Sequence, residues 1–261
     1  MATRTTAGGR ATIGGRTLRR DRWWAQPATS FGVLLAFVIY STWAAFQNAN
    51  YFADPYISPL YSPCIAKICA KTGAPHLGWI GGWWTISPAI LILIVPLGFR
   101  LTCYYYRKAY YRSFWLSPPA CAVAEPRGRY TGETRFPLIL QNAHRYFLYL
   151  ALAFNVILTY DAVLAFDFPD GLGMGLGTVV LIVNAALLWL YSLSCHSCRH
   201  LCGGGVDVFS KHPIRYRFWR QLSVLNARHP QFAWASLVWV GLTDVYIRLV
   251  ASGTVHDPRF F

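Results

Sequence analysis

The chain has few charged residues and very few acids. Only 13% of its 261 residues are Asp, Glu, Lys or Arg, about half the share of roughly 25% that is typical of soluble globular proteins. It contains no catalytic triad, no phosphate-binding glycine loop and no dinucleotide fingerprint. It also lacks a stretch long enough for a large soluble domain. These absences predict no catalytic residue and no reaction carried out by this chain alone.

Apolar residues make up 55% of the chain, and apolar runs of nearly 20 residues recur along it. Runs of that length are typical of transmembrane helices. The first begins at about Phe31, after an arginine-rich head with no small-residue cleavage site, so no cleavable signal peptide is expected. We predict an all-α, polytopic membrane bundle. Its five spans are expected at about 30–47, 83–104, 136–161, 175–195 and 232–250, with a flexible basic tail over 1–22, a membrane domain over 23–251 and a short tail over 252–261.

The basic residues predict how the bundle is oriented. Twenty of the 24 lysines and arginines fall in the head, the two predicted inner loops or the nearby span ends. Cytoplasmic loops are typically rich in these residues. We therefore expect a multi-pass plasma membrane protein with the N-terminus in the cytoplasm and the C-terminus outside. The net charge of +14 then indicates contact with membrane lipids and gives no reason to expect nucleic acid.

The predicted outer side carries two local features. Cys64 and Cys69 lie in a proline-rich loop, where an oxidising compartment would favour a disulfide; free thiols packed in a short helix are the alternative. Asp244 and Arg248 are four residues apart on the last span, and we expect them to form an ion pair.

The densest chemistry lies in the run Cys195-His196-Ser197-Cys198-Arg199-His200-Leu201-Cys202, directly after an apolar span. Thiolates and imidazoles bind zinc, copper and iron–sulfur centres. A straight helix would place the cysteines and the histidines on opposite faces. Either the helix ends near Ser197, which the glycines at 203–205 favour, or some ligands come from elsewhere. Cys198 and His200 form the Cys-x-His half of a Rieske pattern.

Other cysteines and histidines also lie at the predicted inner level. Cys121 follows a rigid Ser-Pro-Pro-Ala turn. His144 lies inside the inner end of a span, where an ionisable group is a functional candidate, as a metal or haem ligand, a quinone contact or a packed residue. Cys103 is expected to be a packed thiol. His229, like His212, precedes a proline and is expected at the surface or in a turn.

A metal centre at the inner level, without a reaction of its own, is best explained as an electron relay. It would take electrons from a soluble partner docked on the basic face and pass them to a quinone. One alternative is a haem b anchor with His144 and a histidine of the 196–200 run as axial ligands. Another is a non-redox membrane scaffold with a structural zinc site.

Several motifs resemble the membrane anchor of actinobacterial succinate dehydrogenase (respiratory complex II). They are Phe-Trp-Leu-Ser-Pro-Pro-Ala-Cys at 114–121, Gly-Glu-Thr-Arg-Phe-Pro-Leu at 132–138, Ser-Cys-His-Ser-Cys-Arg-His at 194–200 and Leu-Asn-Ala-Arg-His at 225–229. The resemblance implies a non-flavin subunit of a succinate:quinone oxidoreductase. It further implies a Rieske-type two-iron two-sulfur cluster instead of haem b, flavoprotein and iron–sulfur subunits as partners, and menaquinone as the electron acceptor.

The resemblance also indicates site residues. The best-fitting ligand set is Cys121, His144, Cys198 and His200. An alternative set keeps Cys195 and His196 and omits Cys121 and His144. For the quinone, position alone indicates Trp115, Ser117 and Arg145.

Overall fold

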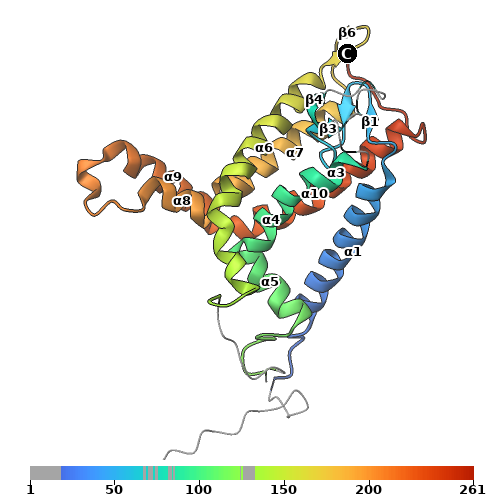
Figure 1. The fold of residues 1–261 in the computed structure, drawn as a ribbon. Coiled ribbons are helices and arrows are strands. Elements are labelled where there is room, and N and C mark those ends of the chain that lie inside the picture. The colour runs from blue at the N-terminus through green and yellow to red at the C-terminus, as the bar shows by residue number, and fades with distance from the viewer. Residues whose placement is uncertain are drawn as a thin grey trace, which may run out of the picture.

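The structure, a computed structural model, describes residues 19–66, 69, 73, 76–81, 84, 86–123, 125 and 133–261. Most of the basic head, residues 1–18, lies outside this range. The described chain is a helical bundle, as predicted (Figure 1). Four helices are long and apolar enough to cross a membrane, and a bent pair can supply a fifth span. The long helices are α1 (Ala25–Gln47), α6 (His144–Leu164), α7 (Leu176–Leu193) and α10 (His229–Ala251).

The expected span over 83–104 is shorter and broken. Helices α3 (Pro88–Ile92) and α4 (Ile94–Thr102) follow each other closely. The chain then bends by 79° into α5 (Tyr104–Phe114), a segment expected to belong to the inner loop. The bend lies at Cys103, whose extended backbone (φ −63°, ψ 129°) separates the two helices.

A second break of the same kind follows α7. Cys195 is extended (φ −63°, ψ 142°) between α7 and the short helix α8 (His196–Gly203). The span thus ends at Leu193, before the point that the glycines indicated, and those glycines instead end α8. The expected second inner loop is mostly helical, with the 3₁₀ turn η2 (Phe209–Lys211) and α9 (Pro213–Ala227). Another 3₁₀ turn, η1 (Leu138–Ala143), leads into α6.

Helix α7 packs against both α6 and α10, while α4 packs on α6 and α1 contacts α5. Polar contacts join these helices inside the bundle, where unpaired polar groups are costly. The expected pair of Asp244 and Arg248 is confirmed at 2.7 Å, and both side chains are buried. Arg248 also donates to the carbonyls of Ala44 and Ala49, so the pair closes α10 against the end of α1.

One end of the bundle, which we call the disulfide end, carries the strands and the C-terminus (Figure 1). The expected disulfide between Cys64 and Cys69 is present there. Hydrogen bonds from Arg259 in the C-terminal segment lower the pKa of Asp170 to about 2. The strands are β1 (Phe52–Ala53) with β2 (Tyr56–Ile57), β3 (Cys64–Ala66) with β4 (His76–Gly81), and β5 (Asp167–Phe168) with β6 (Gly171–Leu172).

Candidate metal centre and adjoining pocket

At the opposite end of the bundle, five cysteine and histidine side chains line one cavity of about 850 Å³. His196 is exposed; the other four, which contact one another in pairs, are Cys103, His144, Cys195 and His229. Each thiol lies at a break between two helices, and each histidine is the first residue of a long helix. We call this end, defined by these four residues, the histidine end.

The thiols and imidazoles meet in two cross-pairs. Nε2 of His144 lies 2.9 Å from Sγ of Cys195. Nε2 of His229 lies 3.3 Å from Sγ of Cys103. Each pair joins one residue from the α4–α6 part of the chain to one from the α7–α10 part, so the cavity lies where these two parts meet.

A neighbouring hydroxyl fixes the tautomer of each imidazole. Oγ1 of Thr102 donates to the carbonyl of Gly98 and lies 2.9 Å from Nδ1 of His144. Because that hydroxyl proton is already used, Nδ1 must be the donor and Nε2 keeps its lone pair. Ser194 repeats the arrangement: it donates to the carbonyl of Tyr191 and lies 2.8 Å from Nδ1 of His229. Both Nε2 lone pairs therefore face the thiols.

An aromatic ring supports each imidazole. Phe99 stacks on His144 with ring centroids 4.8 Å apart. Tyr191 stacks on His229 at 5.2 Å. Phe99 and Tyr191 also touch each other edge to face at 5.2 Å. The two imidazoles are thus held from behind by one pair of touching rings.

The two parts of the site share a short sequence pattern. Phe-Arg-Leu-Thr-Cys at 99–103 corresponds to Tyr-Ser-Leu-Ser-Cys at 191–195. In both, the aromatic ring, the hydroxyl and the thiol occupy the first, fourth and fifth positions. Asn-Ala comes shortly before each histidine, at 142–143 and 226–227. Each contact that a residue of the first part makes in the site, between ring and imidazole, hydroxyl and imidazole, or thiol and imidazole, has a counterpart made by the matching residue of the second part.

The cavity suits a group that is larger than a single ion and carries negative charge. Within the described ranges, no three His, Cys, Asp or Glu side chains gather closely enough to hold one metal ion. No acid lines the cavity, whereas Arg107 and Arg145 do.

The structure brings only some of the predicted ligands together. His144 and Cys195 are in the site, and His196 lines the same cavity from the start of α8. Cys121, Cys198 and His200, which were predicted as ligands together with His144, do not line this cavity. For Cys198 and His200 the reason is the break at Cys195, after which α8 carries both residues away from the cavity.

The environments of these three residues are distinct. Cys121 is exposed, and its carbonyl accepts a hydrogen bond from Arg19. Cys198 is a buried thiol in the apolar core. His200 is exposed, and its Nδ1 lies 2.6 Å from the guanidinium of Arg145.

Sequence reasoning missed Cys103 and His229. His229 was expected at the surface or in a turn; it begins α10 and is only 7% exposed, whereas His212 is exposed. Cys103 is buried as expected, but it contacts an imidazole and does not simply fill space. The paired pentapeptides were the available signal for Cys103, and the Asn-Ala pair shortly before each histidine was the available signal for His229.

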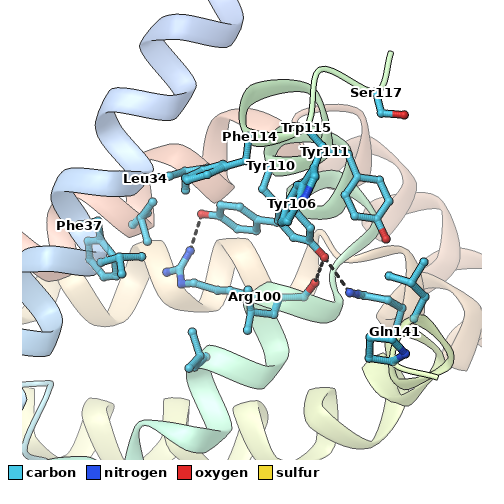
Figure 2. Close-up of a pocket in the computed structure, with 16 residues that line it drawn as sticks. Leu34, Phe37, Arg100, Tyr106, Tyr110, Tyr111, Phe114, Trp115, Ser117 and Gln141 are labelled. Carbon is cyan, nitrogen blue, oxygen red and sulfur yellow. Dashed lines mark hydrogen bonds between the residues drawn. The ribbon is translucent and has the colours of Figure 1, made fainter. Parts of the chain in front are cut away.

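A second cavity, of about 650 Å³, adjoins the first and is lined mostly by aromatic and aliphatic side chains (Figure 2). Trp115 and Ser117, both predicted for a quinone, line it. Arg145, also predicted for the quinone, lines the first cavity and not this one. Polar groups are few; Gln141 donates to the hydroxyl of Tyr110 at 2.7 Å.

A thin layer of side chains separates the two cavities. Arg100 lines the second cavity and lies 4.7 Å above the ring of Tyr191, which stacks on His229. Arg100 also donates to the hydroxyl of Tyr106 at 2.7 Å, a contact drawn in Figure 2. Gln141 lines both cavities. The imidazole of His229 is therefore one ring away from the wall of the second cavity.

Comparison with known proteins then decides the family. The model of the actinobacterial succinate dehydrogenase subunit SdhC matches residues 25–253. The chain belongs to this SdhC family. The solved Mycobacterium smegmatis Sdh1 complex in the apo form contains a chain that is 55% identical, with a TM-score of 0.89 and 100% of each chain covered. No curated protein matches. As an SdhC family member with several apolar helices, the chain is a multi-pass membrane-anchor subunit of succinate dehydrogenase.

Proposed function

We propose that this anchor transfers electrons to menaquinone through a Rieske-type two-iron two-sulfur cluster held by Cys103, Cys195, His144 and His229. The observation that carries the proposal is the convergence of two thiols and two imidazoles on one cavity. When bound, such a cluster takes up and releases electrons at a potential that its ligands and surroundings set.

The donor set matches the chemistry of the group. A Rieske-type cluster uses two thiolates on one iron and two imidazoles on the other. Exchanging the two parts of the site swaps Cys103 with Cys195 and His144 with His229, so the residues divide into a thiol pair and an imidazole pair. A ligating histidine is usually oriented by a hydrogen bond from its other ring nitrogen, and here the hydroxyls of Thr102 and Ser194 accept those bonds.

The same residues favour the cluster over the alternatives. A structural zinc ion needs four ligands around one point, and no three described candidates meet that condition. A haem b group would use the two imidazoles and leave Cys103 and Cys195 without a role. Neither alternative explains why two equivalent thiols face the two histidines.

We infer that menaquinone binds in the second cavity. Small-molecule sites are typically apolar with a few polar groups that fix orientation, and here Arg100, Tyr110 and Gln141 are such groups. The described hydrogen-bond partners of Arg100 are uncharged, including Tyr106 and Ser236. Its positive charge is therefore available to stabilise negative charge that reaches the bound quinone ring.

The proposed partners are the flavoprotein and iron–sulfur subunits, which oxidise succinate and deliver electrons to the histidine end. We place this end in the cytoplasm. The concentration of lysine and arginine on that side supports this orientation, and so does the disulfide at the other end, since disulfides persist in oxidising compartments. Within the anchor, the aromatic layer between His229 and Arg100 covers the short distance between the two cavities.

The test compares two double-histidine variants of the whole complex. His144→Ala with His229→Ala should lower iron and acid-labile sulfide by the share that one two-iron two-sulfur cluster contributes and should remove a Rieske-type paramagnetic signal. Quinone reduction should fall to background, whereas succinate oxidation by an artificial soluble acceptor should continue. The matched control, His196→Ala with His200→Ala, should keep all four properties.

Three results would overturn the assignment. The first is a His144/His229 variant that keeps the full iron and sulfide content of the unmodified complex and its Rieske-type signal. The second is zinc bound to the anchor chain itself, with no iron or sulfide beyond that of the iron–sulfur subunit, which would indicate a structural site. The third is a sharp reduced Soret and α band, which would indicate haem b.

A further inference from the structure

A helical arm leaves the histidine end of the bundle. It consists of α8, η2 and α9, and Figure 1 shows it standing out from the side of the helices. Its two ends are attached to spans: α8 follows the end of α7, and only Arg228 separates α9 from α10. Nδ2 of Asn226 donates to the carbonyl of Ser194 at 2.7 Å and ties the two ends together. The base of the arm therefore lies at the level where two spans leave the membrane.

One side of α9 packs against α8. Arg199 lies 4.7 Å above the ring of Trp219 and donates to Ser223 at 2.8 Å. Arg215 donates to the carbonyl of Cys202 at 2.9 Å. These contacts fix which way α9 is turned about its axis.

The opposite side of α9 has exposed apolar and basic residues. Ile214, Phe218 and Val224 are 72%, 56% and 67% exposed. Phe218 and Arg217 each lie one turn from Ile214, Arg220 lies one turn from Arg217, and Val224 lies one turn from Arg220, so the five residues form one continuous surface about 160° wide. Both arginines are exposed. We call this surface, Ile214, Arg217, Phe218, Arg220 and Val224, the outer face of the arm.

The charge around this face has one sign. No acid occurs between Asp207 and Asp244, whereas Lys211, Arg215, Arg217, Arg220 and Arg228 lie in or beside α9. A cluster of four to eight basic residues next to a span, or on an amphipathic helix, is typical of segments that bind anionic lipid headgroups. Aliphatic and aromatic side chains among the arginines are typical of helices that lie in the interface.

We propose that the outer face of the arm binds the anionic phospholipid headgroups of the leaflet at the histidine end. Arg217 and Arg220 would contact the phosphates, with their apolar stems lying along the surface. Ile214, Phe218 and Val224 would enter the upper acyl region, which removes their exposed apolar area from water. The arm would thereby brace α7 and α10, the two spans that supply Cys195 and His229, against the membrane surface.

The test uses the complete complex in native membranes with a photoreactive benzoylphenylalanine in place of Phe218. Irradiation should attach a phospholipid, seen as a phospholipid-sized mass increase on the anchor chain. The same photoreactive residue in place of Trp219, which faces α8, is the matched control and should give no lipid adduct. Attachment to the iron–sulfur subunit would show that the face binds protein, and no adduct at all would show that it faces water; either result overturns the proposal.

Vesicles of defined composition test the role of charge. The complex with the photoreactive residue at position 218 is reconstituted into phosphatidylcholine with or without phosphatidylglycerol. We expect adducts with phosphatidylglycerol to exceed its share of the lipid several-fold. Arg217→Gln with Arg220→Gln should abolish this enrichment, whereas Arg217→Lys with Arg220→Lys should keep it. Equal enrichment in the glutamine and lysine variants would contradict recognition by charge.

Discussion

Two parts of the bundle form the candidate metal centre, and they are most alike next to the cavity. The first runs from α4 through Cys103 and α5 to His144; the second runs from α7 through Cys195 and α8 to His229. Each places an aromatic ring, a hydroxyl, a thiol and an imidazole in the same relation. Each thiol then pairs with the other part's imidazole.

The two parts differ in what joins the break to the histidine. In the first, the residues after α5 reach the second cavity and contribute Trp115 and Ser117 to its lining. In the second, the connection folds into the arm, whose outer face is exposed. The two parts therefore agree in the residues that line the candidate centre and differ in their connections. One connection lines the second cavity, and the other forms the arm.

The strongest test of this equivalence removes one thiol at a time. Cys103→Ala and Cys195→Ala should each cause complete loss of cluster iron and of quinone reduction, because each leaves one iron short of a ligand. Iron, acid-labile sulfide and the paramagnetic signal of the purified complex measure the effect. Cys198→Ala, a buried thiol outside the site, should keep the cluster. A complex that needs Cys195 but not Cys103 would disprove the equivalence.

The next test removes the hydroxyls that orient the histidines. Thr102→Val and Ser194→Ala should each weaken cluster retention or quinone reduction by roughly 10–100-fold, the usual effect of losing such a partner. Resistance of the cluster to a chelator, compared between variants, is the measurement. Thr102→Ser keeps the hydroxyl and should behave like the unmodified protein. If only one of the two substitutions, Thr102→Val or Ser194→Ala, weakens cluster retention, the two imidazoles are held differently.

A third test asks which of the two cavities binds the quinone. Trp115→Ala should raise the KM for the quinone about tenfold, equivalent to about 1.4 kcal/mol of binding, because it removes an aromatic wall of the cavity. Steady-state kinetics with a quinone analogue measure this. Arg145→Ala, which changes the metal cavity and the contact with His200, should leave that KM nearly unchanged. A similar rise in KM for both variants would place the quinone elsewhere.

The substitution with the smallest expected effect, Tyr191→Phe, makes the second part more like the first. Tyr191 has the position that Phe99 has in the first part, and its buried hydroxyl has no hydrogen-bond partner among the described residues. Tyr191→Phe should therefore leave thermal stability unchanged or slightly higher. Tyr106→Phe, which loses the bond from Arg100, should cost about 1 kcal/mol. Thermal unfolding of the complex compares them, and the opposite order would contradict this account.

Much of the fold could be predicted because its causes are local. Long apolar runs indicated the spans, and the spacing of four residues indicated the ion pair of Asp244 and Arg248. Helices α5 and α9 were missed because their sequences mix arginine with aromatic residues and lack an apolar run. Their helical state depends on packing against α1 and α8, which the local sequence does not reveal.

Of the four residues of the candidate site, the sequence indicated His144 and Cys195 but not Cys103 and His229, for a related reason. The dense run after α7 attracted attention to Cys198 and His200, but the chain breaks at Cys195 and a new helix carries both away. Cys103 and His229 are single residues with ordinary neighbours, separated by 126 positions. Only the three-dimensional meeting of α4 and α10 brings them together. The short repeated pattern around Cys103 and Cys195 was the one indication in the sequence.

In the proposed orientation, the disulfide and the free thiols need opposite redox conditions on the two sides of the membrane. Cys64 and Cys69 are joined, whereas Cys103 and Cys195 would have to stay reduced to bind the proposed cluster. A copy inserted in the opposite orientation would expose the second pair to oxidants and the first to cellular reductants. Such a molecule would lose both its disulfide and its cluster ligands, so the proposed orientation is the one that suits both pairs of cysteines.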